Sequence, residues 1–146
     1  MRCKPLINGE NLGDTGYWVR TQTFLEYVDK KDFYGGLQAN EIEPFYIDEW
    51  FDRRDPKNVF FVLPTFYLQD GSVFFINGRH RTALLARFLG LLPLALTTPD
   101  IDGRPNSGVQ LHAMSQVAFT SFMVRPIVMD EPFDLPDLEI KTTLPS

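Results

Sequence analysis

One stretch of the chain, residues 73–90, constrains the possible fold more than any other. It begins with a short apolar run, Val73–Ile76, which follows an Asp70-Gly71 turn signal, and such a run is typical of a buried strand. A polar turn comes next, and residues 82–89 are then dominated by helix-compatible and apolar side chains, with a glycine supplying a stop. The stretch therefore predicts a strand, a tight turn and a helix in direct succession.

The turn between that strand and that helix carries an unusual set of charges. Asn77 is predicted to cap the helix through its side chain, and Gly78 allows the backbone to approach another group closely. Arg79, His80 and Arg81 then fall in the first helical turn, where each misplaced cation costs about 0.3–1 kcal/mol near the surface. A negatively charged group that shares this space would remove that cost.

Two interpretations of these cations are open. In the first, backbone N–H groups and two guanidinium groups form a phosphate site. In the second, the arginines point away and pair with surface carboxylates. The role of the histidine is also open, because it either locks the turn through a backbone carbonyl, or faces the site and donates to a phosphate oxygen or moves a proton. The predicted phosphate-binding set is Asn77, Gly78, Arg79, His80, Arg81 and Thr82.

The same residues resemble a known signature. Ile76–Arg81, followed by an Ala/Leu-rich helix, resembles the Gly-x-His-Arg signature of the ParB/sulfiredoxin superfamily. The flanks agree, with one predicted strand at Pro64–Leu68 before the hairpin and another at Leu94–Thr97 after the helix. The wording of Phe75–Thr82 is also similar to the plasmid fertility-inhibition factors, which block conjugative DNA export. The resemblance covers about residues 60–97.

This resemblance implies an α/β (α+β) fold, with a single compact ParB/sulfiredoxin-like domain, a small mixed sheet and flanking helices. It implies a plasmid or mobile-element inhibitor of conjugation that binds ATP or CTP with Mg²⁺ and contacts conjugative coupling or type IV secretion components. Some members of that branch are thought to hydrolyse ATP and cut DNA. If that activity is present here, Arg81 and His80 are the candidate catalytic residues.

Two other functions compete with this one. The chain is alternatively a non-enzymatic inhibitor that docks on the DNA-export machinery through its aromatic surface or its acidic tail, or a ParB-like nuclease unrelated to conjugation. The sulfiredoxin reaction is not expected. Arg79 occupies the signature position of the reactive cysteine in sulfiredoxin, and the single cysteine, Cys3, lies far away in the sequence.

The amino-acid composition indicates which macromolecular partners and which cellular compartment suit this chain. The 146 residues carry a net charge of −5, which is not the balance of a protein that coats nucleic acid through bulk charge. Acidic residues concentrate after residue 129, so a local basic patch around the motif remains available for DNA. A single cysteine fits a reducing cytoplasm, and no apolar run is long enough to insert into a bilayer.

A metal held by protein ligands alone is not expected. The chain has two histidines and one cysteine, without the spacing of a zinc site. A magnesium ion carried by a nucleotide needs only one or two carboxylates. The candidates for that role are Asp48, Asp52, Asp70, Asp100 and Asp102.

The rest of the chain is predicted to form three parts: a loosely ordered N-terminal arm over residues 1–16, the domain over residues 17–129, and an acidic, Pro-containing tail over residues 130–146. Within the domain, residues 17–28 fit either a strand or a helical stripe. The remaining predictions are a loop or short helical turn over residues 30–40, a helix over residues 46–54, a strand over residues 59–62, a binding loop over residues 99–108, a helix over residues 109–119 and a last strand over residues 120–129.

Overall fold

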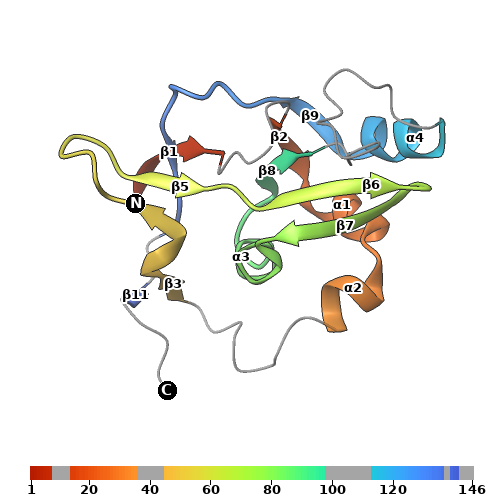
Figure 1. Ribbon diagram of the computed structural model, residues 1–146, viewed down its shortest axis with the longest axis horizontal. Helices are drawn as coiled ribbons and strands as arrows, with labels where there is room; N and C mark the ends of the chain where they lie inside the picture. Colours follow the sequence, from red (N-terminus) through yellow and green to blue (C-terminus); the bar gives the residue numbers. More distant parts are fainter. Residues whose placement is uncertain (8–13, 36–44, 98–112, 137–138, 142–146) are drawn as a thin grey trace, which may run out of the picture.

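The computed structural model describes residues 1–7, 14–35, 45–97, 113–136 and 139–141 (Figure 1). These residues form a mixed α/β domain, with strands in three sheets and helices packed against them. The predicted fold class, a single compact domain with a small mixed sheet and flanking helices, is therefore confirmed. Among the described helices, none is long and apolar enough to cross a membrane.

The larger sheet has five strands in the order β7-β6-β8-β2-β9. All neighbouring pairs are antiparallel except β6 and β8, which run parallel. The hairpin formed by β6 and β7 leads directly into α3, as the sequence predicts. The strands are β2 (Thr15–Arg20), β6 (Thr65–Gln69), β7 (Ser72–Asn77), β8 (Leu91–Leu96) and β9 (Met123–Pro126).

A second sheet has four strands in the order β10-β1-β5-β4, and a third pairs β11 with β3. The chain passes from the second sheet into the first at Leu63 and Pro64. Leu63 N–H donates to Leu6 O at 2.9 Å, and Ala95 N–H donates to Pro64 O at 2.8 Å. The strands are β1 (Arg2–Leu6), β3 (Phe45–Ile47), β4 (Phe51–Asp52), β5 (Phe60–Val62), β10 (Phe133–Asp134) and β11 (Glu139–Lys141).

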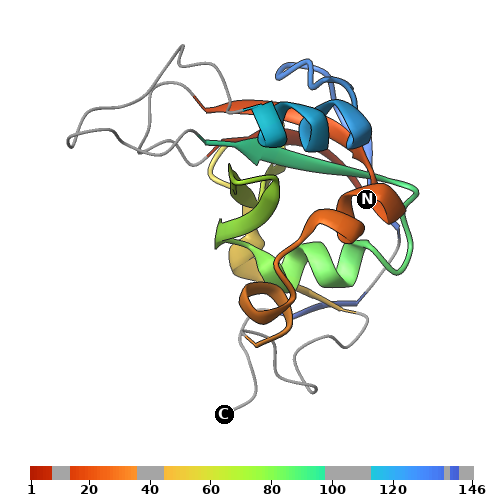
Figure 2. The ribbon, with the colours of Figure 1, turned by 90° about the vertical axis from the view of Figure 1, so that its right-hand side faces the viewer.

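Helices flank the larger sheet on both sides. Figures 1 and 2 show α4 and α3 on opposite sides of strands β2 and β8. The connection between α1 and α2 runs along the edge of the sheet at β7, where Val28 forms a parallel bridge to Val73. The helices are α1 (Thr21–Tyr27), α2 (Lys30–Gly35), α3 (Arg79–Leu85) and α4 (Ala113–Phe122), with a 3-10 helix η2 at Asp48–Trp50.

Phenylalanine rings form the centre of the core. Phe24 of α1 is fully buried and makes edge-to-face contacts with Phe66 at 5.2 Å, Phe75 at 6.1 Å and Phe122 at 5.0 Å between ring centroids. Edge-to-face pairs of this kind contribute about 0.5–1.5 kcal/mol each beyond the burial of their area. The cluster ties α1, the β6–β7 hairpin and the end of α4 together, which fixes the strand that precedes α3.

Several predicted elements need correction. Residues 17–28 contain both of the predicted structures, because β2 ends at Arg20 and α1 begins at Thr21. The helix predicted over residues 46–54 is wrong: that segment consists of the end of β3, η2 and β4. Phe51 pairs with Phe61 of β5, and their rings lie 5.6 Å apart, so burial of these two aromatic side chains in the small sheet outweighs the local helical pattern.

The remaining elements agree with the predictions to different degrees. The short helical turn over residues 30–40 is α2, and the strand over residues 59–62 is β5. The helix predicted over residues 109–119 is observed at Ala113–Phe122, with β9 following it in place of a strand that begins at residue 120. The predicted binding loop over residues 99–108 lies outside the described residues.

The described parts of the predicted arm and tail contain strands that the sequence analysis did not predict. The expected loose arm over residues 1–16 contains β1, which pairs with β5 and β10, so that prediction is wrong over Arg2–Leu6. The predicted tail contributes β10 and β11 to sheets. The terminal ammonium group of Met1 donates to Leu135 O at 2.7 Å, which joins the first residue to the segment that follows β10. The sequence hides these pairings because each partner lies more than fifty residues away.

The burial of Cys3 tests this arrangement of β1. Its side chain is 2 % exposed, and burial raises the pKa of its thiol to about 12. We expect iodoacetamide to modify the folded protein at pH 8 at least about a hundredfold more slowly than the urea-unfolded chain, because the thiolate is the reactive form. Mass spectrometry of timed samples measures both rates. Similar rates in the two states would mean that β1 is not docked.

Candidate functional site

The turn that joins β7 to α3 is built around Gly78. This residue has φ +88° and ψ +18°, the left-handed region, and it is the N-cap of α3 with no side-chain cap bond. Its carbonyl accepts from Thr82 N–H at 2.9 Å and from the Thr82 hydroxyl at 2.9 Å. The predicted N-cap, Asn77, is therefore wrong. β7 extends through Asn77, and the chain reverses one residue later, at the glycine that tolerates a positive φ.

The close approach predicted at Gly78 is made to the protein itself. A Cβ atom at this position would lie 2.6 Å from Pro64 Cβ and 2.6 Å from Arg81 Nη2. The turn thus packs directly on the residue where the two sheets meet. No side chain larger than hydrogen fits there without displacing Pro64, so the glycine is required by packing as well as by its φ angle.

Arg79 is held by a carboxylate that the sequence analysis did not identify. Its Nη2 lies 3.5 Å from Asp32 Oδ1 and 3.5 Å from Phe75 O. The other oxygen of Asp32 accepts from Phe75 N–H at 3.0 Å. Asp32 therefore satisfies a backbone donor on the edge of β7 and neutralises Arg79 at once. For Arg79, the observed contact is the one expected from the second interpretation, in which the arginine pairs with a carboxylate.

Arg81 lies in a different environment. Its Nη2 donates to Asn77 Oδ1 at 2.9 Å, and its Nε is buried with no hydrogen-bond partner among the described residues. Burial lowers the pKa of the Arg81 guanidinium to about 10, while the charge of Glu49 acts in the opposite direction. Within the described ranges no carboxylate forms an ion pair with it. Arg81 is thus a desolvated cation whose closest partner is a neutral amide.

The two other side chains of the predicted set differ in exposure. His80 is half-buried in the first turn of α3. Thr82 is fully buried, and its hydroxyl is used by the Gly78 carbonyl within the turn. Thr82 therefore fixes the position of the turn through its side chain, whereas Arg81, unlike Arg79, has no ion pair within the described part of the chain.

Two of the five carboxylates considered for magnesium, Asp48 and Asp52, are engaged by arginines. Asp48 Oδ1 lies 3.2 Å from Arg53 Nε. Hydrogen bonds from Arg54 lower the pKa of Asp52 to about 2. Within the described part of the chain, no group of three or more His, Cys, Asp or Glu side chains is arranged to hold a metal ion. Asp70 lies in the hairpin turn with φ +52°, and Asp100 and Asp102 lie outside the described residues.

Asp32 is the residue of this region that sequence reasoning missed. The available signal was local: an acidic residue in the first turn of a short helix, which is typical of helix capping. Nothing in that pattern indicates an arginine 47 positions away. Its role follows only from the packing of α2 against the end of β7.

Comparisons with protein-family models, with curated proteins and with solved structures give no match to this chain. The resemblance of residues 76–81 to the ParB/sulfiredoxin signature therefore stays a prediction from the sequence.

Substitution of Gly78 by alanine tests the packing of the turn. We expect Gly78→Ala to lower the free energy of unfolding by at least about 2 kcal/mol, because a Cβ atom is strained at this φ and overlaps Pro64. Gly90→Ala is the matched control, since a Cβ atom there meets nothing within 4 Å, and its cost should stay within about 0.5 kcal/mol. Urea unfolding followed by circular dichroism measures both. Equal costs for the two variants would contradict the close approach.

Substitution of Asp32 tests whether its ion pair with Arg79 stabilises the fold. We expect Asp32→Ala to cost about 2 kcal/mol, because it leaves Phe75 N–H and the half-buried Arg79 without their acceptor. Asp32→Asn should cost less, since its amide oxygen can still accept from Phe75 N–H. A double-mutant cycle with Arg79→Met, measured by urea unfolding, isolates the coupling between the two side chains. A stabilising Asp32–Arg79 pair is disproved if Arg79→Met lowers the free energy of unfolding as much in the Asp32→Ala background as in the wild type.

Proposed function

We propose that this protein binds the phosphate groups of a nucleotide at the β7–α3 turn, with Arg81 as the principal ligand, and that it acts as a fertility-inhibition factor that blocks conjugative DNA transfer. The observation that carries the phosphate site is the state of Arg81. Its guanidinium is desolvated, its Nε has no partner among the described residues, and the protein supplies only the neutral Asn77 amide in direct contact.

A phosphate is the ligand that suits this arrangement best. Burial of a cation without a counter-charge is unfavourable, and an anion that binds beside it offsets that cost. The guanidinium fork donates two parallel hydrogen bonds to phosphate oxygens, which a neutral ligand does not accept as strongly. An anion bound at Arg81 would also approach the first N–H groups of α3, because Arg81 folds back over Gly78.

The other residues of the turn take distinct roles in this proposal. Asn77 orients the Arg81 guanidinium, and Gly78 keeps the turn small. Arg79, held by Asp32, supports the turn and adds positive potential without contacting phosphate directly. His80 is the candidate to donate to a phosphate oxygen or to move a proton, and Arg81 would stabilise the charge of the transition state if the nucleotide is hydrolysed.

The cofactor in this proposal is ATP or CTP with Mg²⁺, and the ion arrives with the nucleotide. The assignment to fertility inhibition depends on the resemblance of the signature and its flanking strands. Such an inhibitor would act in the cytoplasm on coupling or type IV secretion components, and would contact DNA through a local basic patch if it cuts DNA. The third function, a ParB-like nuclease unrelated to conjugation, uses the same phosphate site on a different substrate.

A non-enzymatic inhibitor remains the second candidate, and one observation favours it. The outward face of α4 exposes Met114 and Val117, which are 60 % and 66 % accessible, and no charged residue interrupts that helix. An exposed apolar face suits contact with a protein. The two functions differ in a mating assay: Arg81→Ala abolishes inhibition if nucleotide binding is required, and leaves it intact if inhibition depends on docking alone.

Thermal unfolding with and without nucleotide tests the phosphate site. We expect ATP or CTP with Mg²⁺ to raise the stability of the wild type by about 2.7 kcal/mol when the nucleotide is at about 100 times its dissociation constant. Arg81→Ala should lose this gain. Arg20→Ala, which removes an exposed arginine at the end of β2, is the matched control and should retain it.

Two results would contradict the proposal. One is the absence of any stabilisation at millimolar nucleotide while the wild type and Arg81→Ala are both folded. The other is an equal gain in the wild type and in Arg81→Ala, because binding would then take place elsewhere. In either case the search for function moves to protein partners.

A further inference from the structure

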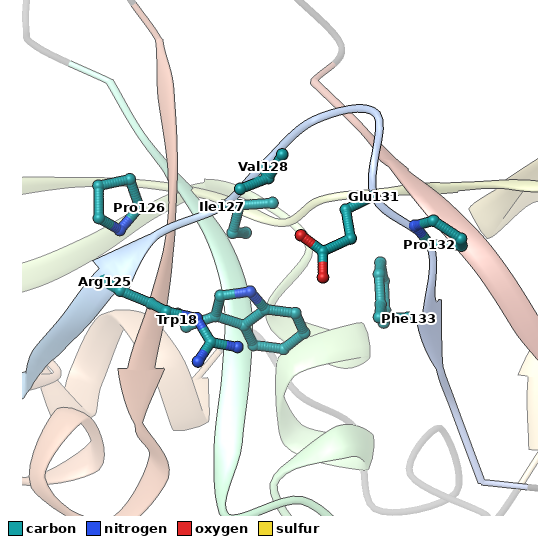
Figure 3. A pocket seen from close by; sticks show the side chains of 8 residues that line it. All are labelled: Trp18, Arg125, Pro126, Ile127, Val128, Glu131, Pro132 and Phe133. Carbon is teal, nitrogen blue, oxygen red and sulfur yellow. The ribbon is translucent and has the colours of Figure 1, made fainter.

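A hollow lies away from the β7–α3 turn, between β2, β9 and the segment that leads into β10 (Figure 3). Its volume is about 420 Å³, which is within the usual range for ligand sites of about 300–1,000 Å³. Two aromatic side chains, Trp18 and Phe133, line it together with Arg125 and Glu131. None of these four residues belongs to the phosphate site proposed above.

The two aromatic side chains are held in place by the strands that carry them. The rings of Trp18 and Phe133 meet edge to face, with centroids 5.3 Å apart and an interplanar angle of 88°. Trp18 is fixed from below because β2 is paired on both sides, with β8 and with β9. Phe133 is fixed by β10, which pairs with β1. The indole of Trp18 therefore lines the hollow in a fixed position, with the phenyl ring of Phe133 beside it.

The two charged side chains differ in what they contact. The Arg125 guanidinium carbon lies 5.9 Å from the centroid of the Trp18 ring, so the indole already accepts a guanidinium group. Figure 3 shows the Glu131 carboxylate projecting toward the space between Trp18 and Phe133. Within the described ranges Glu131 takes part in no ion pair. The Glu131 carboxylate, which has no ion pair among the described residues, therefore lies beside the rings of Trp18 and Phe133.

We infer that this hollow binds an arginine side chain presented by a basic segment of a partner protein. A guanidinium group on the Trp18 face gains the cation–π interaction that Arg125 now makes, and it adds a charge-assisted hydrogen bond to Glu131. The hollow is larger than one guanidinium group, so adjoining residues of the segment would pack on the exposed Val128 and on Pro132, which also line it.

The charge of the protein favours the same partner. The net charge is −5, and Asp130 directly precedes Glu131 in the sequence, whereas Asp134 is paired with Arg2. Electrostatic complementarity of this kind selects basic partners and steers their approach. Arg125 opposes a cationic ligand and must move aside or share the ring. Removal of the Arg125 charge should therefore raise the affinity for a cationic ligand and lower the affinity for an anionic one.

The experiment titrates the full-length, ¹⁵N-labelled protein with a short capped peptide that has one central arginine among glycine and serine residues. The chain has two tryptophans, and Trp18→Phe assigns their indole N–H signals. We expect a saturable shift of the Trp18 signal and none of the Trp50 signal, since Trp50 is buried elsewhere in the core. The matched peptide with citrulline in place of arginine should give no saturable shift.

Two variants distinguish a cation site from any other. Glu131→Gln should weaken binding of the arginine peptide by about two- to fivefold, and Arg125→Met should tighten it by a similar factor, because it removes the competing cation while keeping an unbranched, flexible side chain. The inference is overturned if the citrulline peptide binds equally well, if Glu131→Gln leaves the affinity unchanged, or if Arg125→Met weakens binding, the last of which would indicate an anion or a base in place of a cation. The unchanged spectrum of each variant away from the hollow verifies that it is folded.

Discussion

Direct contact between the backbone of Gly78 and Pro64 is the constraint on which the arrangement of this protein depends. Pro64 lies where the chain passes from the four-stranded sheet into the five-stranded one, and its carbonyl accepts from Ala95 of β8. The turn that starts α3 is pressed against that junction, with no room for a Cβ atom. Because of this contact, the position of α3 is set by both sheets, and the side chains of its first turn have few alternative positions.

The two arginines of that turn show how similar residues acquire different roles from their surroundings. Arg79 points to the edge of β7, where Asp32 already accepts from Phe75 N–H, and the carboxylate serves both donors. Arg81 folds back over Gly78 toward Asn77, and its charge is left without a counter-ion among the described residues. The protein thus compensates one cation within its own fold and leaves the other for a ligand, which is the physical basis of the proposed phosphate site.

Local signals predicted the elements around this turn, and non-local contacts account for what they missed. Short apolar runs, turn chemistry and helix-compatible residues were sufficient for β5, for the β6–β7 hairpin and for the presence of α3, because those patterns are complete within a few residues. The strand at Arg2–Leu6 and the Asp32–Arg79 pair depend on partners far along the chain. The helix predicted over residues 46–54 is wrong for the same reason, since the pairing of Phe51 with Phe61 decides the conformation of that segment.

The distribution of charge favours a nucleotide over a DNA backbone as the ligand of the turn. A protein that holds duplex DNA neutralises several phosphates at once, and its affinity falls steeply with salt in proportion to their number. Here one desolvated guanidinium group at the turn has no ion pair among the described residues, and Arg53 and Arg54 are paired with Asp48 and Asp52. A single half-buried arginine beside a small turn suits the phosphate group of one nucleotide. The net charge of −5 gives little attraction for nucleic acid elsewhere on the surface, and it provides the charge complementarity on which the proposed basic partner of the hollow beside Trp18 depends.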